Sequence, residues 1–188
     1  MHQKTHASAL RSTDIAYIGL FVAAMAICSW ISIPLVVPVT LQTFAVFLAV
    51  GLLGGKRGTI AVCAYIFLGA ISVPVFAGFG GGPGALLGQS GGYIIGFIFT
   101  ALIMWGVTKA LGEKLWAMAL GMVLGLIACY AFGTLWFMMI YTRSTGPVGV
   151  MAVLGWCVFP FIIPDLCKIA LALFLTRRLR RMIRLYSR

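Results

Sequence analysis

Long runs of apolar residues, separated by short polar or glycine-rich segments, make up most of the chain. Six runs lie at residues 15–33, 41–54, 58–75, 91–111, 115–141 and 148–176. A helix needs about 20 apolar residues to cross a hydrocarbon core of about 30 Å, so most of these runs are long enough for one span. The pattern predicts an all-α integral membrane protein, a six-transmembrane-helix bundle that forms one domain over residues 1–188.

Two of the runs depart from this simple pattern. The run at 41–54 is short for a span, and we expect it to tilt or to cross only part of the bilayer. The last run is longer than one span needs and contains Pro160 and Pro164. Because proline is favoured in a first helical turn, we expect a break at 160–164, with a short outer helix before it and the final span starting near Pro164. In a continuous helix, Asp165 would lie nearer the midplane.

Composition agrees with a membrane protein, and charge gives it an orientation. Hydrophobic residues make up 62% of the chain and charged residues 9%. A soluble domain of this length could not bury so much apolar surface. The chain has 14 lysines and arginines. With six spans, Arg143 lies in a loop on the side of the membrane opposite the termini, and Lys168 lies inside an apolar run. The other twelve lie on the same side as the termini: Lys4, Arg11, Lys56, Arg57, Lys109, Lys114, Arg177, Arg178, Arg180, Arg181, Arg184 and Arg188. This excess predicts cytoplasmic N- and C-termini.

The C-terminal tail RRLRRMIRLYSR, residues 177–188, is strongly basic. Such a tail can bind nucleic acid, but next to a membrane span it more often contacts anionic lipid headgroups. We therefore expect anionic lipid, and no nucleic acid, at this tail.

Two ionisable residues lie within the last apolar run. Asp165 and Lys168 are three residues apart, which places them on one face of a helix. Charged side chains at membrane depth are costly and usually line a cavity or a binding site. They are candidate ligand-binding residues; the alternative is a structural ion pair in which each neutralises the other.

The segment FAGFGGGPGALLGQSGGYIIGF, from Phe76 to Phe97, is rich in glycine and carries no charge. A solvated linker is usually rich in charged or serine residues. Glycine backbone can approach a ligand closely, and irregular backbone at membrane depth has to line a cavity or be buried in protein. We interpret the segment as a packed, ligand-facing loop, with a flexible outer loop as the alternative.

Small residues recur along the first run at Ala16, Gly19, Ala23 and Ala26. They form a smooth stripe on a helix, against which another transmembrane helix can pack closely. The stripe serves either packing within the bundle or contact with a second protein.

The motifs of several other function classes are missing. GLLGGKRG, residues 51–58, has Arg57 where a phosphate-binding loop requires serine or threonine, so we expect no ATP hydrolysis by this chain. His2 and His6 lie in the N-terminal tail without a carboxylate cluster, and we expect no metal site. Since no nucleophile and base are arranged together, we expect neither enzyme activity nor a cofactor.

Four stretches resemble one family. Gly88-Gln89-Ser90-Gly91-Gly92-Tyr93 is similar to the Gly-Pro-Thr-Gly-Gly-Tyr motif of BioY proteins, the biotin-specific S components of energy-coupling factor (ECF) transporters. This chain has Gln89 for the proline and Ser90 for the threonine, and it keeps the glycines. The other stretches are PVTLQTFAV (38–46), LLGGKRGTIAV (52–62) and FIIPDLCK (161–168).

The resemblance implies a six-helix protein of a bacterial or archaeal cell membrane that captures biotin from outside with high affinity. It implies a transmembrane coupling subunit and two ATPase subunits as partners, with the small-residue stripe as the docking surface. We expect biotin to be held by Asp165, Lys168, Gln42, Tyr93, Phe79, Gly82, Gly88, Gly91 and Gly92, under loops at 34–42 and 76–90.

The chemistry of biotin fits these side chains. Asp165 can accept from the ureido N–H groups, whereas Lys168 can donate to either the ureido oxygen or the carboxylate. The alternative function is a self-sufficient secondary transporter or channel for another small solute. It is less favoured, because the glycine- and proline-rich interruptions form no evident repeat and only one intramembrane ion pair is available for coupling.

Overall fold

The computed structural model describes the backbone of residues 11–186 and the side chains of residues 11–181. His2, Lys4, His6 and Arg188 lie outside the described residues, as does the side chain of Arg184. The elements are, in chain order, α1 Ser12–Trp30, β1 Ser32–Ile33, β2 Val39–Thr40, α2 Gln42–Leu53, α3 Gly55–Ala70, the 3-10 helix η1 Ala77–Phe79, α4 Pro83–Leu87, α5 Gly91–Leu111, α6 Leu115–Ser144, α7 Val150–Cys157 and α8 Phe159–Tyr186.

The longer helices α1, α2, α3, α5, α6 and α8 each overlap one predicted apolar run. Within the described part of the chain, α1, α5, α6 and the Phe159–Arg181 portion of α8 are long and apolar enough to cross a membrane. By contrast, α2 has 12 residues and α3 has 16, so they extend about 18 and 24 Å. The all-helical membrane protein is confirmed, whereas six complete spans stay a prediction.

The short helix α2 lies inside the bundle. It packs against α1, α3, α5 and α8, and eight of its 12 residues are buried. Because protein rather than lipid covers it, its length does not have to match the hydrocarbon thickness. The helix ends at Gly54, whose φ of 80° lets the chain turn directly into α3.

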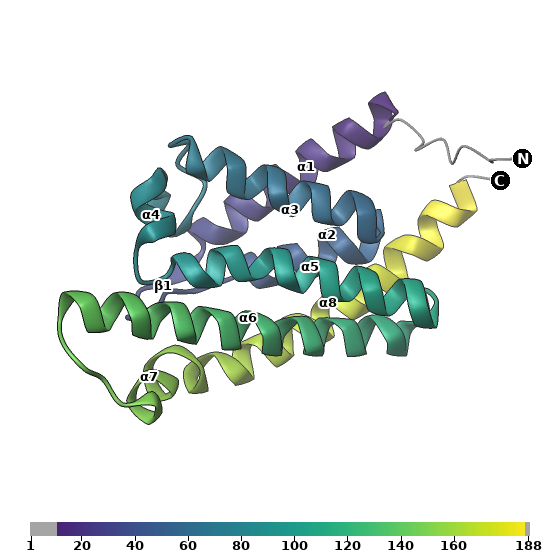
Figure 1. Ribbon diagram of the computed structural model, residues 1–188. Coiled ribbons are helices and arrows are strands. Elements are labelled where there is room, and N and C mark those ends of the chain that lie inside the picture. The colour runs from purple at the N-terminus through teal and green to yellow at the C-terminus, as the bar shows by residue number, and fades with distance from the viewer. Residues whose placement is uncertain (1–10, 187–188) are drawn as a thin grey trace, which may run out of the picture.

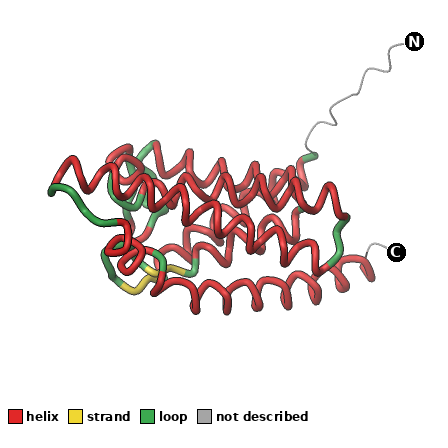
Figure 2. Tube along the Cα trace, turned by 60° about the horizontal axis from the view of Figure 1, so that its bottom comes forward, coloured by secondary structure: helices red, strands yellow, loops and turns green. Residues whose placement is uncertain are grey.

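The short elements gather at one end of the bundle. Figure 1 shows β1, α4 and α7 at this end, and Figure 2 shows the two strands there, whereas α1 begins and α8 ends at the other end. The 3-10 helix η1 directly precedes α4 in the chain. The two strands pair antiparallel, with Ser32 opposite Thr40. The first and last described helix ends therefore share one end of the molecule, as an even number of passes requires, and their cytoplasmic location stays a prediction.

The break in the C-terminal run lies earlier than the sequence predicts. It falls at Val158, between α7 and α8, and not at 160–164. Pro160 lies in the first turn of α8, where backbone N–H groups have no acceptor within the helix, so a proline there removes no hydrogen bond. Pro164 lies inside the helix. Asp165 is consequently in the second turn of α8 and not at its start.

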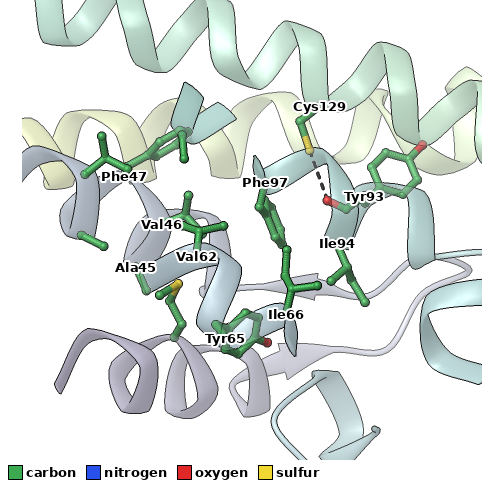
Figure 3. Close-up of a cluster of buried hydrophobic side chains, with 14 of the residues drawn as sticks. Ala45, Val46, Phe47, Val62, Tyr65, Ile66, Tyr93, Ile94, Phe97 and Cys129 are labelled. Atoms are coloured by element: carbon green, nitrogen blue, oxygen red, sulfur yellow. Dashed lines mark hydrogen bonds between the residues drawn. The ribbon is translucent and has the colours of Figure 1, made fainter. Parts of the chain in front are cut away.

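The core lies between the long helices and is filled by large apolar side chains. Phe47 of α2, Tyr65 of α3 and Phe137 of α6 are fully buried. Figure 3 shows Ile66 of α3 and Phe97 of α5 pointing toward one another in this core. Such close packing fixes the distance between helices and therefore the walls of any cavity between them.

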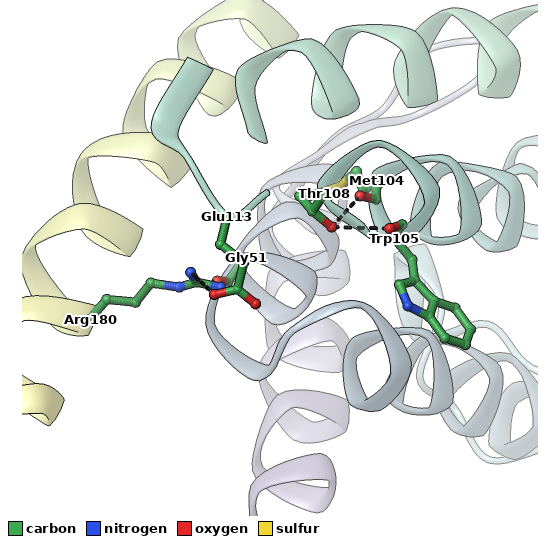
Figure 4. Close-up of polar contacts among 6 residues, drawn as sticks. All are labelled: Gly51, Met104, Trp105, Thr108, Glu113 and Arg180. Carbon is green, nitrogen blue, oxygen red and sulfur yellow. Dashed lines mark hydrogen bonds and ion pairs between the residues drawn. The ribbon is translucent and has the colours of Figure 1, made fainter. Parts of the chain in front are cut away.

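Polar contacts tie the helices together at the end where α8 finishes. Arg180 of α8 pairs with Glu113, after α5, at 2.7 Å, and its Nε donates to the carbonyl of Gly51 in α2 at 2.8 Å (Figure 4). Arg57 of α3 pairs with Asp14 of α1 at 3.1 Å. Two of the three acids in the sequence thus connect helix ends on this side.

Candidate ligand-binding site

A cavity of about 140 Å³ lies where the short elements meet the ends of the long helices. Its walls come from segments that are far apart in the sequence, namely Val37, Pro38, Thr40, Gln42, Thr43, Phe76, Ala77, Gly80, Ala85, Ser90, Tyr93, Ile94, Phe97, Leu126, Cys129, Tyr130, Phe161, Asp165 and Lys168. Most of this lining is apolar or aromatic, and a few polar groups converge on it. That combination is typical of a small-molecule site.

Asp165 is the centre of a polar cluster in the cavity and is only 2% exposed. Lys168 Nζ donates to Asp165 Oδ1 at 2.6 Å, and Tyr130 of α6 donates its hydroxyl to Oδ2. A buried carboxylate needs such partners, because an unpaired charge in apolar surroundings is costly. The predicted pair thus forms an ion pair and lines a cavity at the same time.

Gln42, the first residue of α2, lines the same cavity and is 4% exposed. Its backbone N–H donates to Thr40 Oγ1 at 3.2 Å, which fixes the start of the helix. The side-chain Nε2 is buried and has no hydrogen-bond partner among the described residues. An unpaired buried donor is unfavourable, so this amide is available to an acceptor on a ligand.

Tyr93 of α5 contributes an aromatic wall to the cavity. Its hydroxyl is paired with Thr134 Oγ1 at 3.2 Å, and its ring fits against Gly133, where an added Cβ would lie 2.3 Å from the ring. The carbonyl of Tyr93 accepts from Cys129 Sγ at 3.5 Å (Figure 3). These contacts with α6 fix the ring, which forms an apolar surface next to Phe97 in the lining.

The glycines of the Gly-Gly-Tyr segment lie outside the cavity lining. An added Cβ at Gly91 would lie 1.7 Å from the carbonyl oxygen of Leu86, and one at Gly92 would lie 2.3 Å from the Cβ of Trp136. The carbonyl of Gly88 accepts from Trp136 Nε1 at 3.0 Å. These glycines therefore allow close packing around the start of α5, which differs from the expectation that their backbone faces a ligand.

Phe79 and Gly82 also lie outside the lining. The Phe79 side chain is 64% exposed, and its ring stacks on Trp30 with centroids 4.9 Å apart. Gly82 has a φ of 88°, and its N–H donates to the carbonyl of Gly69 at 2.7 Å. Phe76, from the same segment, is the phenylalanine that reaches the cavity.

The small-residue stripe on α1 is divided between surface and core. Ala16, Gly19 and Ala23 are exposed, whereas Ala26 is 6% exposed and belongs to the core. Gly19, Ala23 and Ala26 line a groove between α1 and α3, which also includes Val75. The stripe is therefore a surface feature at Ala16, Gly19 and Ala23 and a packing feature at Ala26.

Sequence reasoning missed Tyr130, which lines the cavity, and it included Thr40 and Phe76 only as parts of the predicted loops at 34–42 and 76–90. Tyr130 lies within a long apolar run, and only its hydroxyl distinguishes it from the surrounding residues. A polar group at membrane depth often marks a functional site, so this hydroxyl could have identified Tyr130 as a candidate site residue. Its partner Asp165 is 35 residues away, however, and no local pattern connects the two.

Known proteins provide an independent comparison. The model of the BioY family matches residues 1–185. The biotin transporter BioY of Thermotoga maritima is 40% identical over 167 residues, which cover 87% of this chain and 94% of that protein. The probable biotin transporter BioY of Pyrococcus horikoshii is 36% identical over 172 residues, covering 91% and 98%.

A solved structure agrees with these matches. The crystal structure of the S-component for biotin from an ECF-type ABC transporter superposes with a TM-score of 0.80 at 29% sequence identity. The match covers 92% of this chain and 95% of that one. The whole fold, and not a single motif, is therefore shared.

Proposed function

Because the chain belongs to the BioY family, we propose that it is the biotin-binding S component of an ECF-type vitamin uptake transporter, a transport subunit and not an enzyme. It captures biotin at the extracellular side and delivers it inward together with a separate ATP-driven module. It needs no cofactor of its own, since biotin is the cargo and the partner subunits use the ATP.

The observation that carries this proposal is the set of polar groups in an otherwise apolar cavity. Biotin has a ureido ring with two N–H donors and one carbonyl acceptor, an apolar thiophane ring and a valeryl chain that ends in a carboxylate. Asp165 accepts from the ureido N–H groups, and the unpaired Nε2 of Gln42 donates to the ureido carbonyl. Lys168 donates to the ureido carbonyl or to the carboxylate, and Tyr93 and Phe97 pack on the thiophane.

The outer segments close over the ligand in this proposal. The cavity of about 140 Å³ is smaller than the roughly 300 Å³ at the low end of typical ligand pockets. Val37 and Pro38 come from the loop at 34–42, and Ala77 and Ala85 come from the segment at 76–90. These two segments move apart to admit biotin and then cover it.

The partners dock on surfaces away from the cavity. The exposed residues Ala16, Gly19 and Ala23 of α1 receive the transmembrane coupling subunit, which carries two ATPase subunits. Both termini lie in the cytoplasm in this proposal, which is supported by the excess of lysine and arginine on their side of the membrane. The exposed arginines Arg177, Arg178 and Arg181 near the end of α8 then contact anionic lipid headgroups.

Calorimetric titration of the purified chain with biotin tests the proposal, with dethiobiotin and lipoate as competitors. We expect tight one-to-one binding of biotin that lipoate does not displace, because lipoate lacks the ureido group and would leave buried polar groups unpaired. Folded protein that shows no heat of binding with biotin would contradict the proposal.

The variant Asp165→Asn tests the polar cluster. Because hydrogen bonds to a charged group contribute about 1.5–3 kcal/mol, we expect biotin affinity to fall by about 10- to 150-fold in the same titration. Glu113→Gln is the matched control, since it also replaces a carboxylate with an amide but lies outside the cavity lining. An Asp165→Asn protein that binds biotin as tightly as the parent would remove this residue from the site.

A further inference from the structure

The segment between α3 and α4 forms one wall of the cavity through Phe76, Ala77 and Gly80. Ser72 and Phe79 in this segment have φ values of 72° and 58°, a left-handed conformation that residues other than glycine rarely adopt. Strained backbone of this kind persists only where the surrounding structure holds it. The wall therefore depends on contacts from outside the segment.

Three side chains from α1 and α3 converge on two consecutive carbonyl groups of the segment. Tyr65 donates its hydroxyl to the carbonyl of Val75 at 2.8 Å, and Trp30 Nε1 donates to the carbonyl of Pro74 at 3.0 Å. Ser29 Oγ lies 2.6 Å from the same Val75 oxygen and shares its single proton between that oxygen and a carbonyl of its own helix. Ser29 and Tyr65 are both fully buried, so water does not replace these donors.

Phe76 follows directly after these two carbonyls. Its ring meets the ring of Tyr65 nearly edge-on, with centroids 5.6 Å apart and an interplanar angle of 75°. It also fits against Gly69, where an added Cβ would lie 2.0 Å from the ring. Tyr65 therefore holds both the backbone before Phe76 and the ring of Phe76 itself, while Phe76 lines the cavity.

We infer that Tyr65, Trp30 and Ser29 are positioning residues, which hold Pro74 and Val75 so that Phe76 closes the cavity over its ligand. Tyr65, Trp30 and Ser29 lie outside the cavity lining, so they act on the ligand through Phe76. The inference rests on the proposed function for the identity of the ligand, biotin. Because this wall has to move before a covered ligand leaves, loss of an anchor raises the dissociation rate.

The test compares two variants that each lose one buried hydroxyl. Tyr65→Phe keeps the ring against Phe76 and removes only the donor to Val75. Thr100→Val is the matched control, because the Thr100 hydroxyl is also buried and donates to the Gly125 carbonyl at 2.9 Å, between α5 and α6. Release of labelled biotin is followed after addition of unlabelled biotin, and hydrogen–deuterium exchange of residues 74–82 is measured without ligand.

Tyr65→Phe should release biotin about 3- to 10-fold faster than the parent, the factor that corresponds to one lost hydrogen bond. Its exchange at 74–82 should also be faster, while Thr100→Val keeps the parent values in both measurements. Trp30→Phe, which retains an aromatic ring for Phe79, should change both values in the same direction as Tyr65→Phe.

The outcomes separate this inference from the proposed function. Unchanged exchange at 74–82 in Tyr65→Phe overturns the anchoring, whether or not the chain binds biotin. Faster exchange with the parent release rate overturns the closing role of Phe76, and equal acceleration in Thr100→Val overturns the specific role of Tyr65. A parent chain that binds no biotin refutes the proposed function, and the exchange measurement still decides the anchoring.

Discussion

Asp165 and Gln42 face the same cavity, but their hydrogen-bonding capacity is used differently. Both oxygens of Asp165 already have donors, from Lys168 and Tyr130. The Nε2 group of Gln42 has none among the described residues. A ligand therefore shares the carboxylate with existing partners but is the first partner of the amide, so the two residues should respond differently to mutation.

Gln42→Met should change stability and binding in opposite directions. Replacing an unpaired buried amide by an apolar side chain of similar shape should leave the ligand-free unfolding temperature unchanged or raise it. Biotin affinity should fall by about 5- to 100-fold, because the ureido carbonyl loses a donor. Thermal unfolding without ligand and calorimetry with biotin measure the two effects.

Thr176→Val provides the control for this residue. Thr176 Oγ1 is the other buried side-chain polar atom without a partner among the described residues, and Thr176 is outside the cavity lining. Its replacement should affect stability as Gln42→Met does and leave biotin affinity unchanged. Equal affinities for Gln42→Met and the parent would mean that the amide does not contact the ligand.

At the level of elements, the start of α5 depends on close contact with α6. The two helices form the most extensive pairing in the described structure. Gly92 allows α5 to approach Trp136, and Gly96 lies where an added Cβ would be 2.8 Å from Cys129 Sγ. Because Tyr93, Ile94 and Phe97 follow these glycines, the approach of the helices also sets the position of one cavity wall.

Gly92→Ala should destabilise the protein and weaken biotin binding together. The new methyl group would overlap Trp136, and overpacking of this kind costs about 1–3 kcal/mol of unfolding free energy. Gly106→Ala in the same helix has no atom within 4 Å of the added Cβ, so we expect it to be neutral or stabilising by up to about 1 kcal/mol. Thermal unfolding and biotin titration of both variants check this pair; a Gly92→Ala protein as stable as Gly106→Ala would contradict it.

On the scale of the whole molecule, binding and docking occupy different regions. The cavity lies among the short elements, and Ala16 lies near the opposite end of α1, about 20 Å along the helix from Ser29. The ion pairs of Asp14 and Glu113 hold the helix ends on that side. A change at Ala16 can therefore affect a partner without disturbing the cavity.

Ala16→Trp should reduce biotin uptake and leave binding intact. A bulky side chain on the exposed stripe prevents close helix approach, and a clash of about 1.4 kcal/mol at the interface already lowers partner affinity tenfold. Uptake is measured in cells that contain the coupling and ATPase subunits, and binding is measured on the purified chain. Ile127→Trp is the control, because Ile127 of α6 is also exposed, at 57%. Unchanged uptake by Ala16→Trp would reject the stripe as the docking surface.

The helices and the chemical type of the site could be predicted from the sequence. Apolar runs of membrane-spanning length predict helices, because backbone in a bilayer has to satisfy its own hydrogen bonds. Asp165 and Lys168 stood out because charge is rare in such runs. The break at Val158 was not predictable, since prolines at positions 160 and 164 are compatible with several helix starts.

The sequence by itself determined the membrane location, the family and two charged residues of the site, since length, hydropathy, motif spacing and rare charge are all local properties of the chain. Only the tertiary structure decided that Tyr130 and Phe76 line one cavity with Asp165, and that Gly91 and Gly92 pack against Leu86 and Trp136 instead of lining it. The physical reason is that burial and hydrogen-bond partnership depend on which helices are neighbours. In this fold the partners of Asp165 include a hydroxyl 35 residues away, and no periodicity within a single helix specifies that pairing.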